Sequence, residues 1–292
     1  MDNVGSIITG KIIEALESGT IPWRRTWRSG TAKSLTSNRE YRGINTVILG
    51  YSPYKSRYWV TFKQAKRLGG FIKKGEKSTT VVYWHWRTNE EMEALVDSGR
   101  SKNPAPCTPF LSGVFNLDQT EGIARPADDV PLNDCQKVEA AEKLVAGIPN
   151  RPEVMHGTEL KPCYRPSLDR IELPHLSQFE SAEHYYGCYL HEAMHSTAHP
   201  KRLNRLPEVG CDVLSRYSYE ELIAELGASM LRGHCGLDSV DAIENSASYI
   251  EGWLKVLSSD RGMILKAASA AQRGVDYLRG VSFEEVAIKE AA

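Results

Sequence analysis

The stretch His191-Glu192-Ala193-Met194-His195 decides how this sequence is interpreted. On a helix, residues four apart lie on the same face, so the imidazoles of His191 and His195 can bind one metal ion together. Glu192 follows His191 directly, where it can act as general base on a water molecule held by the ion. The stretch therefore predicts a metal site on a helix.

Such a site needs a third protein ligand and an open position for water. A histidine six residues after His195 would mark the metzincin arrangement, but that position holds Lys201. Residues 220–225, Glu-Glu-Leu-Ile-Ala-Glu, are instead similar to the gluzincin pattern, in which the first acid binds metal and the later one orients a ligand histidine. We predict Glu221 as the third ligand and Glu225 as the orienting acid. The assignment of Glu225 as the ligand stays open.

His199 continues the helix face that carries His191 and His195. We predict that it supports the site from behind the ligands. A fourth ligand, an acid in the cleft and a cap at the helix end are the alternatives. Two imidazoles and one carboxylate suit a single divalent ion. Zn²⁺ is our first assignment and Mn²⁺ the alternative, because geometry and availability choose between them.

The charge of the chain is divided between its two ends. Residues 1–87 hold 16 lysines and arginines against 5 acids, whereas residues 88–292 hold 20 against 32. The near-neutral total therefore hides a basic segment of net charge +11 and an acidic segment of −12. Five of the six tryptophans also lie in the basic segment. Cations and flat rings together favour binding of single-stranded nucleic acid, because they neutralise phosphates and stack on bases.

Several residues of the basic segment could line a path for the nucleic-acid backbone. We expect few sequence-specific contacts with base edges. The candidates for nucleic-acid contact are Trp23, Arg24, Arg25, Trp27, Arg42, Asn45, Lys63, Lys66, Lys73, Lys74 and Lys77. A solvated surface is the alternative for each cation. Packing in a core is the alternative for Trp59 and Trp84, because each lies in a run typical of a strand.

The order of elements predicts an α+β fold in two domains. Hydrophobic spacing indicates a helix at 4–17, and the β-branched run 79–86 indicates a strand. We expect a loop or hairpin at 88–112, and helices for most of the chain after 133. The linker-like residues 124–132 place the boundary near 128. The result is a small basic domain over 1–128 and a mainly helical domain over 129–292.

Other features favour a protein of the cytoplasm. No apolar run approaches the ~20 residues that a membrane span needs, so we expect no membrane partner. The amino terminus lacks the basic and apolar regions of a secretory signal. The six cysteines form no CxxC pair, and we interpret them as reduced thiols.

Taken together in this order and spacing, the motifs resemble the ArdC family of antirestriction proteins of conjugative plasmids. The matching segments are 21–23 with Trp27, 41–45, 58–64, 72–77, 114–116, 191–195 and 220–225. The resemblance implies an N-terminal domain that binds single-stranded DNA and a C-terminal zincin-like metallopeptidase domain. It also implies protection of incoming DNA from host restriction endonucleases. Residues 69–71 and 88–112 match no pattern of the family.

Three hypotheses follow. In the first, the chain coats single-stranded DNA or obstructs a restriction endonuclease and carries a divalent metal. In the second, it is an active metalloprotease that cleaves a host protein, and the basic domain only delivers it. In the third, the metal is structural, so that chelation unfolds the second domain.

Overall fold

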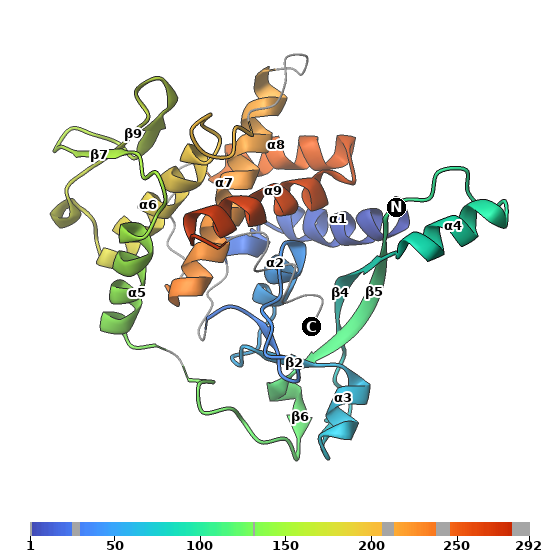
Figure 1. The fold of residues 1–292 in the computed structure, drawn as a ribbon. Helices are drawn as coiled ribbons and strands as arrows, with labels where there is room; N and C mark the ends of the chain where they lie inside the picture. Colours follow the sequence, from blue (N-terminus) through green and yellow to red (C-terminus); the bar gives the residue numbers. More distant parts are fainter. Residues whose placement is uncertain (1, 25–29, 131, 206–212, 238–245, 282–292) are drawn as a thin grey trace.

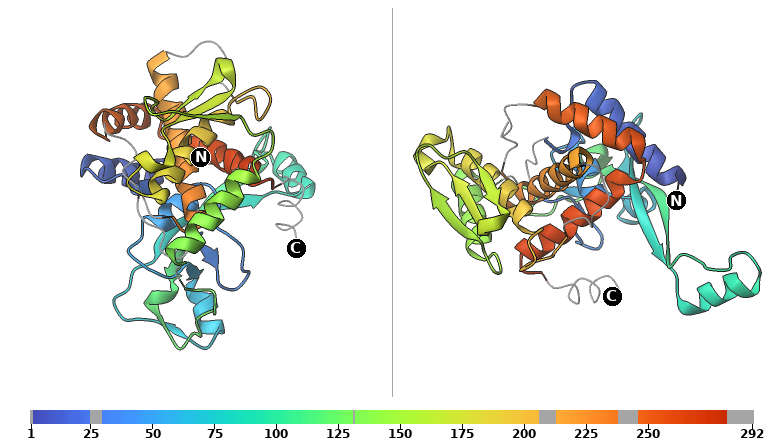
Figure 2. Two further views of the ribbon diagram at one scale, coloured as in Figure 1. Left: turned by 90° about the vertical axis from the view of Figure 1, so that its left-hand side faces the viewer. Right: turned by 90° about the horizontal axis from the view of Figure 1, so that it is seen from above.

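A computed structural model describes residues 2–24, 30–130, 132–205, 213–237 and 246–281. A helical body forms the centre, with a small lobe of short strands below it (Figure 1). The sheet of β7, β8 and β9 stands on one side of this body, and an arm of β4 and β5 that ends in α4 projects from the other (Figure 2). The mixture of helices and sheets confirms the predicted α+β class.

The element bounds agree closely with the sequence patterns. The helices are α1 Asp2–Glu17, α2 Ile44–Gly50, α3 Phe62–Arg67, α4 Asn89–Asp97, α5 Asp134–Ala146, α6 Ala182–Ser196, α7 Val213–Cys235, α8 Ser246–Ser259 and α9 Met263–Leu278. The strands are β1 Lys33–Ser34, β2 Tyr58–Val60, β3 Phe71–Ile72, β4 Thr79–Trp86, β5 Cys107–Asn116, β6 Thr120–Glu121, β7 Glu153–His156, β8 Cys163–Arg165 and β9 Arg170–Leu173. The region expected as a loop or hairpin is a hairpin whose connection contains α4.

The basic lobe is organised around a four-stranded sheet of order β1-β2-β5-β4. Strands β1 and β2 are parallel, and the other pairs are antiparallel. Trp59 packs with Val81 and Val114 in a small core and is 2% exposed. The packing alternative for Trp59 is therefore confirmed. Helix α3 starts where expected, because Thr61 and Gln64 form a reciprocal cap.

The N-terminal segment packs against the C-terminal helices. Trp23 meets Trp253 of α8 edge to face, with ring centroids 5.1 Å apart. The Ser229 hydroxyl of α7 donates to the Trp23 carbonyl at 2.5 Å. Arg42 pairs with Asp276 of α9 at 2.5 Å. Hydrophobic side chains of α1 belong to the same buried cluster as those of α6, α7 and α9. The two predicted halves therefore share one main core.

Two glycines, one on α7 and one on α9, make room for a methionine of α6. Met194 of α6 is fully buried. A Cβ at Gly227 of α7 would lie 2.2 Å from its Cε, and a Cβ at Gly274 of α9 would lie 2.6 Å from the same atom. Glycine within a helix costs about 1 kcal/mol relative to alanine, so a packing reason is expected. Here Gly227 lets α7, which carries the carboxylates, pack closely on α6 at Met194.

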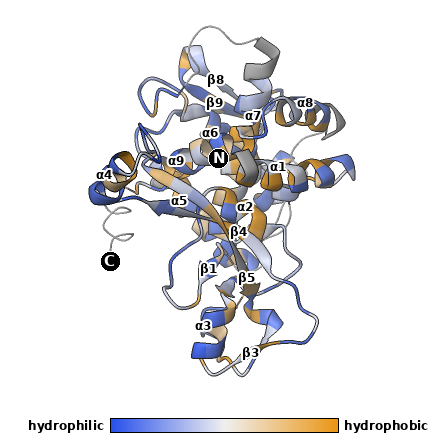
Figure 3. Ribbon diagram, turned by 90° about the vertical axis from the view of Figure 1, so that its right-hand side faces the viewer, coloured by the Kyte–Doolittle hydropathy of each residue, from blue (hydrophilic) through white to orange (hydrophobic). Residues whose placement is uncertain are grey.

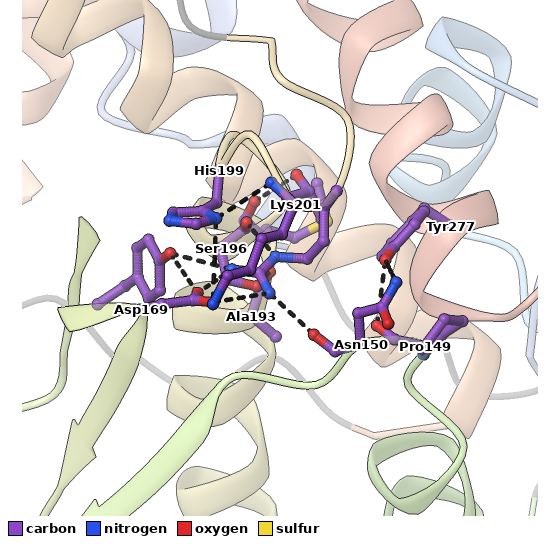
Figure 4. A network of polar contacts seen from close by, with 12 residues as sticks. Pro149, Asn150, Asp169, Ala193, Ser196, His199, Lys201 and Tyr277 are labelled. Atoms are coloured by element: carbon purple, nitrogen blue, oxygen red, sulfur yellow. Dashed lines mark hydrogen bonds and ion pairs between the residues drawn. The ribbon is translucent and has the colours of Figure 1, made fainter. Parts of the chain in front are cut away.

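Arg202 holds the end of α6 against neighbouring segments. Its guanidinium is fully buried and donates to the carbonyls of Ser196 at 2.6 Å and Asn150 at 2.8 Å. It also pairs with the Asp169 carboxylate, which Tyr164 approaches at 2.8 Å. Asp169 lies at the centre of this network (Figure 4). Hydrogen bonding and charge outweigh the effect of burial and lower the pKa of Asp169 to about 2.

Two general expectations can be compared with the described residues. Among them, no helix is both long and apolar enough to cross a bilayer. All five cysteines in this part are free, namely Cys107, Cys135, Cys163, Cys188 and Cys235. Cys211 lies outside the described residues.

We predict that Asp169→Asn lowers the free energy of unfolding by about 2–3 kcal/mol at pH 7, because it leaves the buried Arg202 without its counter-charge. The native pKa lies below the ordinary 3.8, so the contribution exists above that value and disappears as the pH falls towards 2. Urea unfolding of both proteins at pH 7 and at pH 3 measures this. Lys201→Ala removes only an exposed partner of Asp169 and should cost less than about 1 kcal/mol. An equal loss at both pH values for Asp169→Asn would contradict the ionic origin.

Candidate metal centre and nucleic-acid surface

Helices α6 and α7 bring His191, His195 and Glu221 together. The Nε2 atoms of the two histidines are 3.1 Å apart. The Glu221 carboxylate lies 3.6 Å from Nε2 of His191 and 3.4 Å from Nε2 of His195. The predicted ligand atoms therefore converge on one point. Among the described residues, this is the group of histidines, cysteines and acids with spacing suitable for a metal ion.

The spacing of these atoms fits one divalent ion. Ligand atoms about 2.0–2.2 Å from a tetrahedral ion stand about 3.3–3.6 Å from one another. The 3.1 Å between the two Nε2 atoms is close to that range, and one oxygen of Glu221 lies 3.6 Å from His191 while the other lies 3.4 Å from His195. Taking one ligand atom from each residue, the three atoms lie within 4.8 Å of one another. The donor set of two imidazoles and one carboxylate also leaves a fourth position for water, as catalytic sites require.

A second acid lies behind each histidine. Glu225 approaches Nδ1 of His191 at 3.6 Å, and Glu220 approaches Nδ1 of His195 at 3.2 Å. An acceptor at Nδ1 favours the proton there and leaves Nε2 free to bind metal. The structure places Glu225 in the predicted orienting position and Glu221 in the ligand position. The alternative with Glu225 as ligand requires the opposite arrangement.

Glu220 and Arg205 are supporting residues that the sequence interpretation missed. Arg205 pairs with both oxygens of the Glu220 carboxylate and donates to the Met194 carbonyl at 2.9 Å. It thereby joins the end of α6 to the acid behind His195. Glu220 had a visible signal, because it adjoins Glu221. Arg205 had none, because it lies in the connection after α6.

The acids make the pocket strongly anionic. Burial alone would lower the pKa of His191, but contact with Glu221 and the charges of Glu192 and Glu225 raise it to about 9. Burial would raise the pKa of Glu221, but His191, His195 and the Tyr217 hydroxyl outweigh it and lower that pKa. The pocket therefore favours a bound cation, either protons or a metal.

The remaining predicted groups of this centre lie in different surroundings. Glu192 is buried on α6 directly after His191. Helix α6 ends at Ser196, so His199 lies in the following turn. Its Nδ1 accepts from the Lys201 N–H at 3.2 Å and lies 3.9 Å from Asp169 (Figure 4). The prediction that His199 supports the ligands is therefore wrong, because the helix face does not continue to it.

Five lysines predicted for nucleic-acid contact are exposed in the basic lobe. They are Lys63, Lys66, Lys73, Lys74 and Lys77. Lys63 and Lys66 lie on α3, and the other three lie between β3 and β4. Helix α3 and strand β3 form the end of the lobe farthest from the helical body (Figure 3). The structure therefore gathers these cations at one end of the molecule. The Lys73 ammonium also donates to the Asp118 carbonyl at 2.8 Å.

Other candidates for nucleic-acid contact have structural roles. The prediction for Trp23 is wrong, because its ring is 2% exposed and packs on Trp253. The Asn45 amide has a structural role, because it donates to the Val82 carbonyl and accepts from the Val82 N–H, both at 2.7 Å. Arg42 is engaged with Asp276. Arg25, Trp27 and the Arg24 side chain lie outside the described residues.

Two aromatic residues of β4 are exposed, unlike the buried Trp23. Trp84 is 37% exposed and Trp86 is 67% exposed. Trp84 is therefore not buried in a core, contrary to the packing alternative. Trp86 was not among the residues predicted for nucleic-acid contact. A run of alternating valines and rings predicts a strand, but it does not tell whether the strand end is covered.

Comparison with known protein families gives two matches. Residues 2–110 match the family described as the N-terminal domain of anti-restriction factor ArdC. Residues 139–270 match the family described as zincin-like metallopeptidase. The two segments together contain the basic lobe and the histidine cluster.

Three curated proteins are similar over nearly the whole chain. Two are DNA primases TraC of Escherichia coli, each 31% identical over 97% of this chain. The chain spans 27% and 20% of their respective lengths. The third, protein y4eC of Sinorhizobium fredii (strain NBRC 101917 / NGR234), is 31% identical over 93% of this chain and 90% of its own length.

Solved structures provide the most complete comparison. The metal-free crystal structure of antirestriction protein ArdC from plasmid R388 is 33% identical, with a TM-score of 0.73. A Mn(II)-bound structure of the same protein is 31% identical, with a TM-score of 0.74. Each comparison covers 95% of this chain and 97% of the other. The chain belongs to the ArdC family of antirestriction proteins.

Proposed function

We propose that this chain protects plasmid DNA from host restriction endonucleases in the cytoplasm during conjugation. It binds single-stranded DNA without sequence preference and carries a divalent metal ion in its zincin-like half. The main support is the similarity to the R388 antirestriction protein over 95% of the chain. Exposed lysines at the end of the basic lobe add support, because phosphate neutralisation dominates non-specific binding.

In this proposal His191, His195 and Glu221 hold the metal, with Zn²⁺ first and Mn²⁺ as the alternative. The Mn(II)-bound structure of the R388 protein supports a divalent ion in the present chain. A divalent ion with an open position makes water a stronger acid and a better nucleophile. In the proposal Glu192, the residue after His191, accepts the proton of that water, and Glu220 and Glu225 hold the imidazoles in orientation.

We predict one tightly bound divalent ion per chain, measurable by elemental analysis of the purified protein. Glu221→Ala removes one of three ligands and should weaken binding by at least about 100-fold. Glu192→Gln keeps all three ligands and should retain the ion, which makes it the matched control. Retention of the metal by Glu221→Ala with full affinity would contradict the assigned ligand set. Unfolding of the C-terminal half on chelation would favour a structural metal.

For DNA, we predict that binding to a 20-nucleotide oligo-dT weakens steeply as salt rises, because the lysines displace condensed counterions. Fluorescence anisotropy at several salt concentrations gives the slope of log affinity against log salt. Lys74→Ala combined with Lys77→Ala should lower that slope by up to about 1.4, or about 0.7 for each lost phosphate contact. The control is Lys161→Ala, an exposed lysine of the other half. An affinity that does not change with salt would refute phosphate binding.

A second candidate function is proteolysis of a host protein. The open metal position and the buried Glu192 favour it, because both are parts of a water-activating centre. In this case the basic lobe only delivers the enzyme to DNA, and the partner that matters is the cleaved protein.

Glu192→Gln distinguishes the two functions. Since amide and carboxylate have nearly the same size, the change removes the base and preserves the fold and the metal. We expect this variant to protect a plasmid transferred into a restricting host as well as the parent chain does. The measured quantity is transfer efficiency relative to a non-restricting host. Loss of protection with the metal still bound would favour proteolysis as the function.

A further inference from the structure

The arm formed by β4 and β5 carries large rings that the body does not cover. Tyr83 is 65% exposed, Trp86 is 67% exposed and Phe110 is 50% exposed. At the tip, α4 buries none of its residues. The arm extends away from the helical body in two independent views (Figures 1 and 2). An exposed apolar group of this size marks an interaction surface.

The strand register divides these rings between two faces. Directly paired residues share a face, and alternate residues of a strand share a face. Tyr83 pairs with Phe110, and Trp86 pairs with Cys107. One face therefore contains Tyr83, His85 and Phe110. The other contains Trp84, Trp86 and Leu111, which pairs with Val82. We call this second face the tryptophan face.

Charge distinguishes the two faces. His85 lies 3.4 Å from Glu91 of α4, so the acidic start of α4 reaches the face of Tyr83. On the tryptophan face, the Lys11 ammonium lies 3.4 Å from the Thr80 hydroxyl, where the arm leaves the body. Thr80 is four residues before Trp84 and on the same side of the strand. A lysine therefore lies beside the tryptophan face, and a glutamate lies beside the other face.

The spacing of the two tryptophans suits a stacked base. Residues two apart on one strand are about 6.6 Å apart. This is about twice the 3.4 Å rise of one nucleotide in stacked DNA, so one base fits between two successive rings. Strand β4 spans about 26 Å from the lysine-rich turn to Trp86. A segment of single-stranded DNA of the ~4–16 nucleotides that one binding module contacts can extend over this length.

We propose that the tryptophan face is the base-stacking surface for a single-stranded polynucleotide, with Trp84 and Trp86 contacting bases and Lys11 a phosphate. The proposal rests on the single-strand binding proposed above and gives it a location. It replaces the buried Trp23 as the source of stacking. The acidic helix α4 marks the end of the path, because its charge opposes the phosphates.

The test is binding of full-length protein to a fluorescein-labelled 20-nucleotide oligo-dT at fixed salt. Trp86→Ala removes a mostly exposed ring and should weaken binding about tenfold. Trp86→Phe restores a flat ring and should return the affinity to within about threefold of the parent. Tyr83→Ala is the matched control, because it removes an equally exposed ring from the opposite face. It should change affinity by less than about twofold.

A salt series separates stacking from charge. Trp86→Ala should leave the slope of log affinity against log salt unchanged, whereas Lys11→Ala should lower it by about 0.7. Thermal unfolding by circular dichroism verifies that each variant is folded.

Three outcomes overturn the proposal. If Trp86→Ala binds as the parent does while the Lys74→Ala/Lys77→Ala variant is weakened, the location is wrong and single-strand binding stands. If the parent chain binds no oligo-dT, both proposals fail. If Trp86→Ala instead converts a dimer to a monomer in sedimentation without affecting DNA binding, a second copy of the chain occupies this face.

Discussion

The close contact of α6 with α7 is the constraint on which the rest of the site depends. Met194 occupies the space between Gly227 and Gly274, where any larger residue would meet its side chain. His191, about one helical turn before Met194, and His195, the residue after it, face the acids of α7. Because helices normally pack 8–10 Å apart, small residues at the contact determine whether a glutamate reaches an imidazole. Gly227 thus helps to determine the geometry of the candidate metal centre.

The acids of α7 face both nitrogen atoms of the imidazoles. Glu221 faces the Nε2 atoms, whereas Glu220 and Glu225 face the two Nδ1 atoms. Adjacent residues on a helix point about 100° apart, so Glu220 and Glu221 can serve different atoms of His195. Arg205 compensates part of this negative charge and fixes Glu220. The centre therefore holds its histidines in place from both sides before any ion is considered.

Much of this could be predicted from the sequence, and the limits have physical causes. Local patterns located β4 and the helices from α5 to α9 well, because periodicity and caps act over a few residues. The cluster of His191, His195 and Glu221 could be predicted because the residue spacing within each helix determines which side chains share a face. Trp23 was misassigned, and the burial of Trp84 was left open, because burial depends on contacts far away in the sequence. Trp23 meets Trp253 across 230 positions, and nothing near Trp84 indicates that the arm leaves the body. His199 was misassigned because the helix ends three residues earlier.

The shared core also bears on how the two halves act together. A boundary near 128 lies between the two matched families, but α1 and Trp23 pack on α7, α8 and α9. Separating the chain there would expose Trp253 and leave Asp276 without Arg42. The basic lobe and the metal centre are consequently held at a fixed distance by one set of buried side chains. A polynucleotide bound on the lobe or arm would then remain outside the metal pocket, because the lysines and the tryptophan face lie away from α6. With the proposed DNA binding, this separation leaves the metal centre accessible to a second molecule.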